Sequence, residues 1–356
     1  MINARKLIGL YRQVQYFLFQ RSWGVINCVS ECSIHGNISD YKKDCVHPCV
    51  RYTDVPFRGY HWWMVYTPYR NANASQENPI LCYGEGNGEP PTEWHVFKEI
   101  IPQPKIGYNS DPNLLFIDNV MYLFWRENET ERLLDNKMHR GTFCMKITEE
   151  DMVKPDEIIL AETLSYEDHE VSPTFVNYKN KHIAFANHVL FKSPRLQTIK
   201  PVLKQIIDRI TFVTDLLGFY SQQKSYGIAV WEGDDYNKPF KYIKSVYPKH
   251  CNRLYRPWHS DSFEYKGKLY MIMQSNQCNA DVCLARWNDD LSELTMASKP
   301  LVTNASIGMV GLYKPTAIVY CDYLYIYITA QKENDRGVNN LYQGKISLSE
   351  LHSLWD

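Results

Sequence analysis

Short apolar runs that double back across a tight polar turn recur through most of the chain. The clearest example is the segment 108–126 (YNSDPNLLFIDNVMYLFWR), in which apolar residues 114–116 are followed by Asp118-Asn119 and by a second apolar run at 121–125. Asp and Asn tolerate the positive φ angles that two-residue hairpin turns require. The pattern therefore predicts two antiparallel strands joined by a tight turn.

The same pattern occurs again downstream, each time with a polar opening and a turn at the same spacing. These copies open at Ser172-Pro173, His259 and Lys314-Pro315, and their turns are Lys179-Asn180, Lys266-Gly267 and Cys321-Asp322. A looser copy opens at His47-Pro48, with a hairpin connection about five residues longer. Five hairpins at intervals of roughly 55 to 90 residues are typical of a propeller with four strands in each blade.

The predicted fold class is therefore all-β, a five-bladed β-propeller over residues 41–356. Two segments break the pattern with apolar residues at helical spacing, which predicts an N-terminal helical extension within residues 1–40 and a helix inserted in blade three at about 195–220. The inserted helix either packs on the flank of a blade, or caps one mouth of the propeller and contacts a partner.

Charge and cysteine content bound the partners and the compartment. Lys+Arg 39 against Asp+Glu 40 leaves a net charge of -1, which gives no basic field for nucleic acid. No apolar run is long enough to span a membrane. The ten cysteines are scattered or loosely paired, and the N-terminal segment lacks the unbroken apolar stretch of a secretion signal. We therefore expect reduced thiols and a cytoplasmic protein, with a periplasmic or secreted one less favoured.

Cofactor motifs are absent from the sequence. No CxxC pair and no HExxH helix occurs, so we expect no zinc site and no bound cofactor. Aromatic residues make up 14% of the chain, with 26 Tyr and 9 Trp. Most of them are expected to fill the core. The remainder could line a cleft in which flat rings stack on sugars, and the candidates for that role are Trp125, Trp258 and Tyr313.

Propeller geometry gathers the openings of the repeats at one place. The innermost strand of every blade runs beside the central axis, so equivalent residues at its start meet around one mouth. The openings that this rule brings together are His47, Asp111, Ser172, His259 and Lys314, with Asp44, Glu170 and Asp261 beside them. Polar groups converging at one end of a packed fold are typical of a functional site.

Each of these residues also has a structural interpretation. Asp111 precedes a proline and could accept hydrogen bonds in a turn. His47 and His259 could be hydrogen-bonded core histidines, and Glu170 could be a solvated loop charge. Lys314 could line the pore without a part in the chemistry.

The strand openings HP, SDP, SP and WHSD, together with the segments YHWWMVYTPY and ENPIL, resemble the five-bladed β-propeller glycoside hydrolases related to families 43 and 117, particularly uncharacterised bacterial members. The resemblance covers roughly residues 44–345. It implies an oligosaccharide or polysaccharide partner, and it allows a structural cation near the central channel. The catalytic set implied by the resemblance is an Asp base on blade one, a second Asp on blade two and a Glu acid on blade three.

Transferred residue by residue, this set is only partly present. Asp111 occupies the blade-two position, but His47 stands where the blade-one Asp is expected, and Val171 lies two before Pro173 with Glu170 one place earlier. Either Glu170 or Asp261 then supplies the second carboxyl group, or a histidine takes over its acid/base role. We expect the pair to be Asp111 and Glu170. Catalytic candidates are Asp111, Glu170 and His47, and substrate-binding candidates are His259, Asp261, Ser172, Trp258, Trp125, Arg126, Tyr313 and Lys314.

The function predicted from the sequence is that of a glycoside hydrolase that cleaves a glycosidic bond with a carboxylate pair at the propeller axis. One alternative is a glycosyltransferase or glycoside phosphorylase on the same scaffold. A second is a glycan-binding propeller without catalysis, which the replacements at His47 and Val171 favour. A third is a protein-interaction scaffold built around the helix at 195–220.

Overall fold

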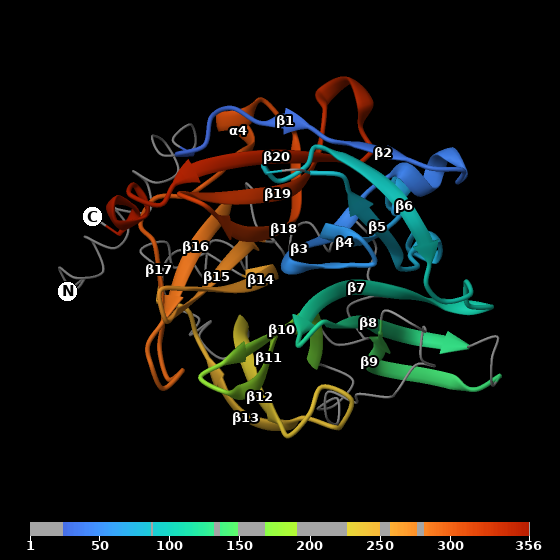
Figure 1. Ribbon diagram of the computed structural model, residues 1–356, viewed down its shortest axis with the longest axis horizontal. Helices are drawn as coiled ribbons and strands as arrows, with labels where there is room; N and C mark the ends of the chain where they lie inside the picture. Colours follow the sequence, from blue (N-terminus) through green and yellow to red (C-terminus); the bar gives the residue numbers. More distant parts are fainter. Residues whose placement is uncertain are drawn as a thin grey trace, which may run out of the picture.

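A computed structural model describes residues 24–86, 88–131, 136–148, 168–190, 226–249, 257–275 and 281–355. Within these ranges the chain forms five sheets arranged around a common centre (Figure 1). The predicted all-β five-bladed propeller is therefore confirmed. The apolar residues of the expected N-terminal helix (7–18) and the helix expected at 195–220 lie outside the described residues.

Each blade is built on an antiparallel meander whose first strand, on the inside, carries the polar opening in its N-terminal half. Blade one consists of β3 (Val46–Phe57), β4 (Tyr60–Thr67), β5 (Ile80–Gly84), β6 (Glu93–Glu99) and a parallel outer strand, β2 (Ser33–His35). Blade two has three described strands, β7 (Ile106–Ile117), β8 (Val120–Glu131) and β9 (Met138–Ile147).

The remaining blades each have four described strands. Blade three consists of β10 (Asp168–Tyr178), β11 (Lys181–Leu190), β12 (Tyr226–Gly233) and β13 (Lys241–Val246). Blade four consists of β14 (Pro257–Tyr265), β15 (Lys268–Ser275), β16 (Val282–Trp287) and β17 (Leu294–Met296). Blade five consists of β18 (Gly311–Tyr320), β19 (Tyr323–Gln331), β20 (Asn340–Ser347) and β1 (Ser30–Glu31).

Helical structure in the described residues is short and lies in the connections between strands and after the last strand. The 3-10 turns are η1 (Asp40–Lys43), η2 (Arg70–Ala72), η3 (Ala74–Gln76), η5 (Glu333–Asp335) and η6 (Leu351–Leu354), and the α-helical turn is α4 (Asn304–Ile307). None of the described helices is long and apolar enough to cross a membrane.

The predicted turn dipeptides of blades two, three and four form the hairpin turns in the structure. Asp118 and Asn119 have φ angles of 48° and 60°, and the dipeptides Lys179-Asn180 and Lys266-Gly267 also have positive φ at both residues. Blade one differs from the prediction, because its turn is the dipeptide Arg58-Gly59 (φ 49° and 85°). The extra residues of that copy lie within β3, where the pairing with β4 is irregular between Tyr52 and Phe57.

The hydrophobic core is divided among the five contacts between neighbouring blades. On β4, for example, Trp62 and Met64 pack toward blade five, whereas Trp63 and Val65 pack toward blade two. This alternation follows from the two-residue period of a strand, which sends successive side chains to opposite faces. Each blade is thus apolar on both faces, which leaves the ends of the innermost strands as the place for polar groups.

The ring is closed by residues that the sequence placed in a separate N-terminal extension. β1 pairs with β20 at the outer edge of blade five, and β2 pairs with β6 at the outer edge of blade one. Between these strands the backbone N–H of Cys32 donates to Leu341 and that of Ser33 donates to Thr92. Residues 30–35 therefore belong to the propeller and join its first and last blades.

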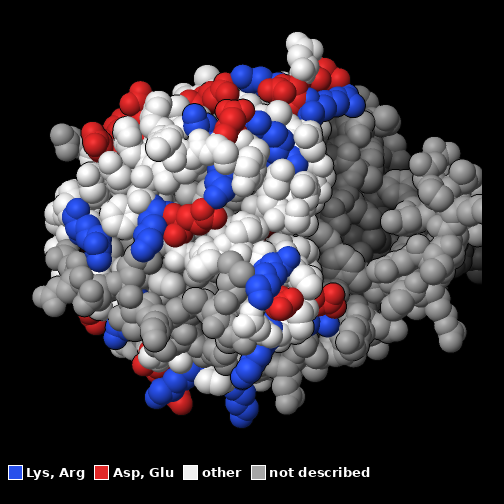
Figure 2. Space-filling view, turned by 90° about the vertical axis from the view of Figure 1, so that its right-hand side faces the viewer, with Lys and Arg blue, Asp and Glu red and all other residues white. Residues whose placement is uncertain are grey.

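The surface and the thiols agree with the composition. On the face drawn in Figure 2, Lys and Arg lie among Asp and Glu. The eight cysteines within the described residues are all free thiols.

Candidate functional site

The five strand openings are related by the repeat, because each innermost strand carries a pairing irregularity that includes the opening residue or, in blade four, immediately precedes it. The irregularities lie between Val46 and Cys49, Ser110 and Asn113, Val171 and Thr174, Pro257 and His259, and Leu312 and Pro315. Such bulges bend a strand and redirect a side chain. Positive φ angles at His47 (53°), Asp111 (49°) and Ser172 (49°) accompany them, a conformation uncommon for residues other than glycine.

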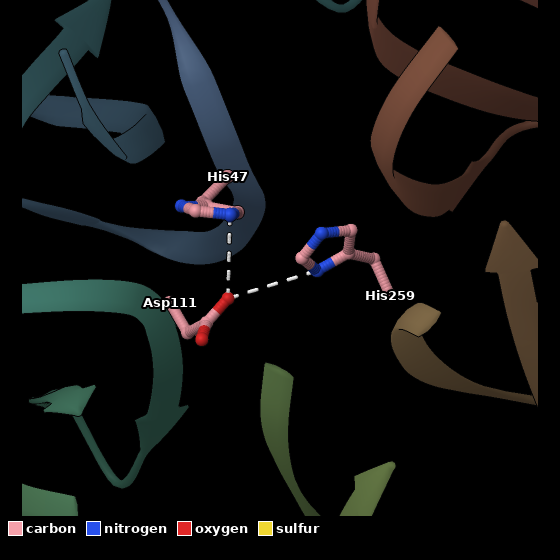
Figure 3. Close-up of side chains that lie close together, drawn as sticks. All are labelled: His47, Asp111 and His259. Atoms are coloured by element: carbon pink, nitrogen blue, oxygen red, sulfur yellow. Dashed lines mark ion pairs between the residues drawn. The ribbon is translucent and has the colours of Figure 1, made fainter. Parts of the chain in front are cut away.

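The three central side chains of the site are His47, Asp111 and His259. They come from β3, β7 and β14 and converge near the propeller axis (Figure 3). Asp111 Oδ1 lies 3.4 Å from His47 Nε2 and 3.7 Å from His259 Nδ1. All three are buried. We call the five openings His47, Asp111, Ser172, His259 and Lys314 the mouth layer.

Asp111 is held as an ionised carboxylate. Arg126 Nε donates to Asp111 Oδ2 at 2.8 Å, and Ser172 Oγ donates to Oδ1 at 3.1 Å while also contacting His259 Nδ1. Burial alone would raise the pKa of Asp111, but the electrostatic influence of the neighbouring His47 and of the Arg126 guanidinium outweighs burial and holds that pKa well below its ordinary value. Burial, reinforced by His47, lowers the pKa of His259 well below its ordinary value, which keeps that imidazole neutral.

Glu77 orients His47, and the sequence analysis did not identify it. Glu77 Oε2 and Thr67 Oγ1 each lie 3.1 Å from His47 Nδ1. Burial raises the pKa of Glu77, partly offset by its hydrogen bond to His47. When Glu77 is ionised, Nδ1 carries the proton and Nε2 presents its lone pair. Glu77 lies in the connection between β4 and β5, so alignment of the hairpins could not identify it. The sequence feature that could have suggested it is the acidic residue before Asn-Pro in the segment ENPIL.

The chemistry of the central residues fits a divalent cation. One ligand atom each from His47, Asp111 and His259 lies within 4.8 Å of the others. His47 Nε2 and His259 Nε2 are buried and have no hydrogen-bond partner among the described residues. Buried polar atoms are normally hydrogen-bonded, so two unpaired imidazole nitrogens in one place require an explanation. Two imidazoles and a carboxylate, with a carboxylate behind one imidazole, form a common set for zinc and related metals.

Aromatic rings lie against this centre. The partly exposed ring of Tyr313 has its centroid 4.4 Å from that of His259 and 5.2 Å from that of His47. The ring of Trp258, also partly exposed, lies 5.9 Å from that of His259 and nearly perpendicular to it. These two of the three proposed stacking residues therefore adjoin the mouth layer.

The structure also places the candidates Trp125, Lys314 and Glu170. Trp125 is buried in the core between blades one and two, where its indole N–H donates to Glu127 at 2.9 Å. Lys314 is fully buried and its Nζ donates to the carbonyl of Pro112 at 3.3 Å. Burial lowers the pKa of Lys314, opposed by the charge of Asp111. Glu170 lies in β10, two residues before Ser172.

Asp261 belongs to a second polar layer, deeper in the channel. Arg51 donates two hydrogen bonds to its carboxylate, at 2.8 and 2.6 Å, and Thr174 donates a third at 3.0 Å. Burial would raise the pKa of Asp261, but Arg51 lowers it to about 2. We call this the inner layer; one residue from each blade forms it, namely Arg51, Asn113, Thr174, Asp261 and Thr316.

No known protein-family model matches the chain, and no curated protein matches its sequence. Among solved structures, it is similar to an N-acetylgalactosamine deacetylase from F. plautii in complex with blood group B trisaccharide, with a TM-score of 0.66, 14% identity, and coverage of 92% of this chain and 97% of that one. It is also similar to a family 117 glycoside hydrolase of Zobellia galactanivorans (TM-score 0.55, 12% identity, 90% and 91% covered). A third similar structure is the GH43_1 enzyme of Xanthomonas citri complexed with xylose, with a TM-score of 0.55, 9% identity, and coverage of 96% of this chain and 93% of that one.

At these identities the likeness concerns the fold. The chain has the five-bladed propeller architecture found in glycoside hydrolases of families 43 and 117, as the sequence resemblance implied.

Proposed function

We propose that this protein is a carbohydrate-active hydrolase that removes an acyl substituent from a sugar, with a divalent cation held by His47, Asp111 and His259. The observation that carries the proposal is the pair of buried imidazole nitrogens without hydrogen-bond partners, His47 Nε2 and His259 Nε2, beside an ionised carboxylate. A cation bound there would polarise a carbonyl oxygen and lower the pKa of a bound water. The role of the cation is thus functional, beyond the structural role that the sequence resemblance allowed.

The surrounding residues have defined tasks in this scheme. Arg126 fixes Asp111 through Oδ2, which leaves Oδ1 directed at the two imidazoles. Glu77 holds His47 with Nε2 toward the centre. Tyr313 and Trp258 supply aromatic surface for a sugar ring beside the reacting group. Similarity to a sugar deacetylase over nearly the whole length of both chains supports deacylation as the reaction.

Cleavage of a glycosidic bond, predicted from the sequence, is the second candidate. Two of the similar structures are glycoside hydrolases. The pKa of Glu77 is raised by burial and that of Asp111 is lowered by its cationic neighbours, and carboxyl groups shifted in opposite directions are the usual acid and base of such enzymes. We rank deacylation first because the carboxyl group of Glu77 is already hydrogen-bonded to His47 and Thr67. In that position Glu77 orients the imidazole of His47 and does not face a substrate.

One experiment separates these functions. The protein is treated with a chelator, reloaded with Zn²⁺ or Mn²⁺, and incubated with a panel of N-acetylated, O-acetylated and unsubstituted glycans. We expect release of acetate that disappears on chelation and returns with the metal. His259→Ala should abolish this release. His61→Ala is the matched control, because His61 is a partly buried histidine of β4 that hydrogen-bonds the carbonyl of Thr53 and stacks on Tyr52, away from the mouth layer.

Other outcomes would assign other functions. Release of reducing sugar that persists with chelator would support the glycosidase. Dependence on phosphate or on a nucleotide sugar would support the phosphorylase or the transferase. Binding of glycans without any turnover would support the non-catalytic propeller. Each of these results contradicts cation-dependent deacylation.

A further inference from the structure

A tyrosine beside the mouth layer extends the aromatic surface outward. Tyr69 lies in the connection between β4 and β5, and its partly exposed ring is nearly parallel to that of Tyr313, with centroids 6.2 Å apart and an interplanar angle of 16°. Tyr313 in turn contacts the rings of His259 and His47. The rings therefore form a continuous strip from the two histidines to Tyr69.

A buried carboxylate fixes the position of Tyr69. Asp44 is 1% exposed and accepts hydrogen bonds from the backbone N–H of Tyr69 at 3.3 Å, from the backbone N–H of Asn339 at 2.8 Å and from Asn339 Nδ2 at 2.9 Å. Asn339 Nδ2 also donates to the carbonyl of Tyr69 at 3.3 Å. Burial of a carboxylate is costly unless such bonds satisfy it. Asp44 and Asn339 thus clamp the blade-one loop to the loop that joins β19 and β20.

The clamped loop has an irregular backbone. Asn71 and Ala72, which follow Tyr69 closely, have φ angles of 57° and 56°, and the N–H of Asn71 donates to the carbonyl of Gly337 at 2.8 Å. A left-handed conformation is unfavourable for alanine, and strained backbone of this kind occurs preferentially at ligand clamps. The loop is therefore held in one conformation by contacts with blade five.

We propose that Tyr69 is a substrate-binding residue whose ring stacks on the apolar face of a sugar unit next to the reacting one. The substrate is accordingly an oligosaccharide and not a monosaccharide. Asp44 is a positioning residue, which acts through the backbone of Tyr69. The inference rests on the proposed action on a carbohydrate, and it adds a subsite for a second sugar ring.

Ligand-observed NMR tests the subsite without requiring turnover. The probes are xylose, glucose, galactose and N-acetylgalactosamine, each as the monosaccharide and as a trisaccharide. For the trisaccharide that the unmodified protein binds most tightly, we expect Tyr69→Ala to weaken binding about tenfold, the scale of one lost aromatic contact. Binding of the corresponding monosaccharide should change less than about twofold. Tyr69→Phe should retain the affinity, since it keeps the ring.

Two further variants complete the design. Asp44→Asn should reproduce part of the loss for the trisaccharide alone, and Asn339→Ala does the same if Asp44→Asn fails to fold. Tyr323→Ala is the matched control, because Tyr323 is an exposed tyrosine at the hairpin end of blade five, opposite the mouth layer. Equal losses for monosaccharide and trisaccharide, or no loss, would overturn the subsite while leaving the proposed function intact. Failure of the unmodified protein to bind any of the sugars would overturn both.

Discussion

The two polar layers of the central channel come from the same five strands, yet they differ in one respect. In the inner layer the carboxylate of Asp261 is held by Arg51 and by neighbouring hydroxyl and amide groups, and no side-chain atom of its five residues is left without a hydrogen-bond partner among the described residues. In the mouth layer two imidazole nitrogens have no such partner. The inner layer, whose hydrogen bonds are complete, stabilises the ring of blades. The mouth layer, whose imidazole nitrogens lack hydrogen-bond partners, has the arrangement expected of a ligand-binding site.

The sharpest test of this contrast removes the charge at the mouth layer. Asp111→Asn keeps the size of the side chain but removes the carboxylate that Arg126 and the two histidines surround. We expect hydrolysis to fall by about a thousandfold or more, the scale of losing a central group. The midpoint of thermal unfolding, measured alongside, should move less than it does for the inner-layer variant below. Activity near that of the unmodified protein would show that the mouth layer is not the reactive centre.

The corresponding change in the inner layer should act on stability. Asp261→Asn leaves the largely buried guanidinium of Arg51 without its counter-charge, and breaking such an ion pair costs up to about 3–5 kcal/mol. Denaturant unfolding measures this loss. The activity per folded molecule should be retained below the transition. A variant as stable as the parent would remove the distinction between the layers.

Substitution of Glu77, which contacts His47 on the side away from Asp111, should have a smaller effect on metal binding. Glu77→Gln weakens the hold on His47 Nδ1 without removing a ligand, and changes of this kind lower metal affinity by about 10–100-fold. Calorimetric titration of the metal-free protein with Zn²⁺ measures it. Thr67→Val, which removes the neutral contact to the same nitrogen, should cost less. If the two variants bind zinc equally well, Glu77 does not orient the ligand.

The sequence was sufficient for the fold and for the list of strand openings. Both depend on local signals, the turn dipeptides and the spacing to the polar opening, which recur because each blade repeats the same structural unit. The pairing of Arg51 with Asp261 could not be predicted in this way, because those residues are far apart in the chain and Arg51 is not at an equivalent position of the repeat.

Functional residues in the connections between strands could not be predicted from the repeat either, because they lie outside the hairpins that it aligns. Glu77 and Tyr69 lie between β4 and β5, and the use of Asp44 as a clamp depends on a loop of blade five. The strands β1 and β2 were missed for a related reason. They are too short to show a period of two, and it is the partners β20 and β6 that select their conformation.

The seam between the first and last blades has a consequence for synthesis of the protein. The two residues of β1 are made before the hairpins of all five blades, but they complete their pairing only with residues 342 and 343 of the last blade. Until blade five has been made, these residues cannot connect the first blade to the last one. Pairing of β1 with β20 is therefore a late step in closing the ring during translation, and a nascent chain stalled before blade five would leave this strand unpaired and open to aggregation.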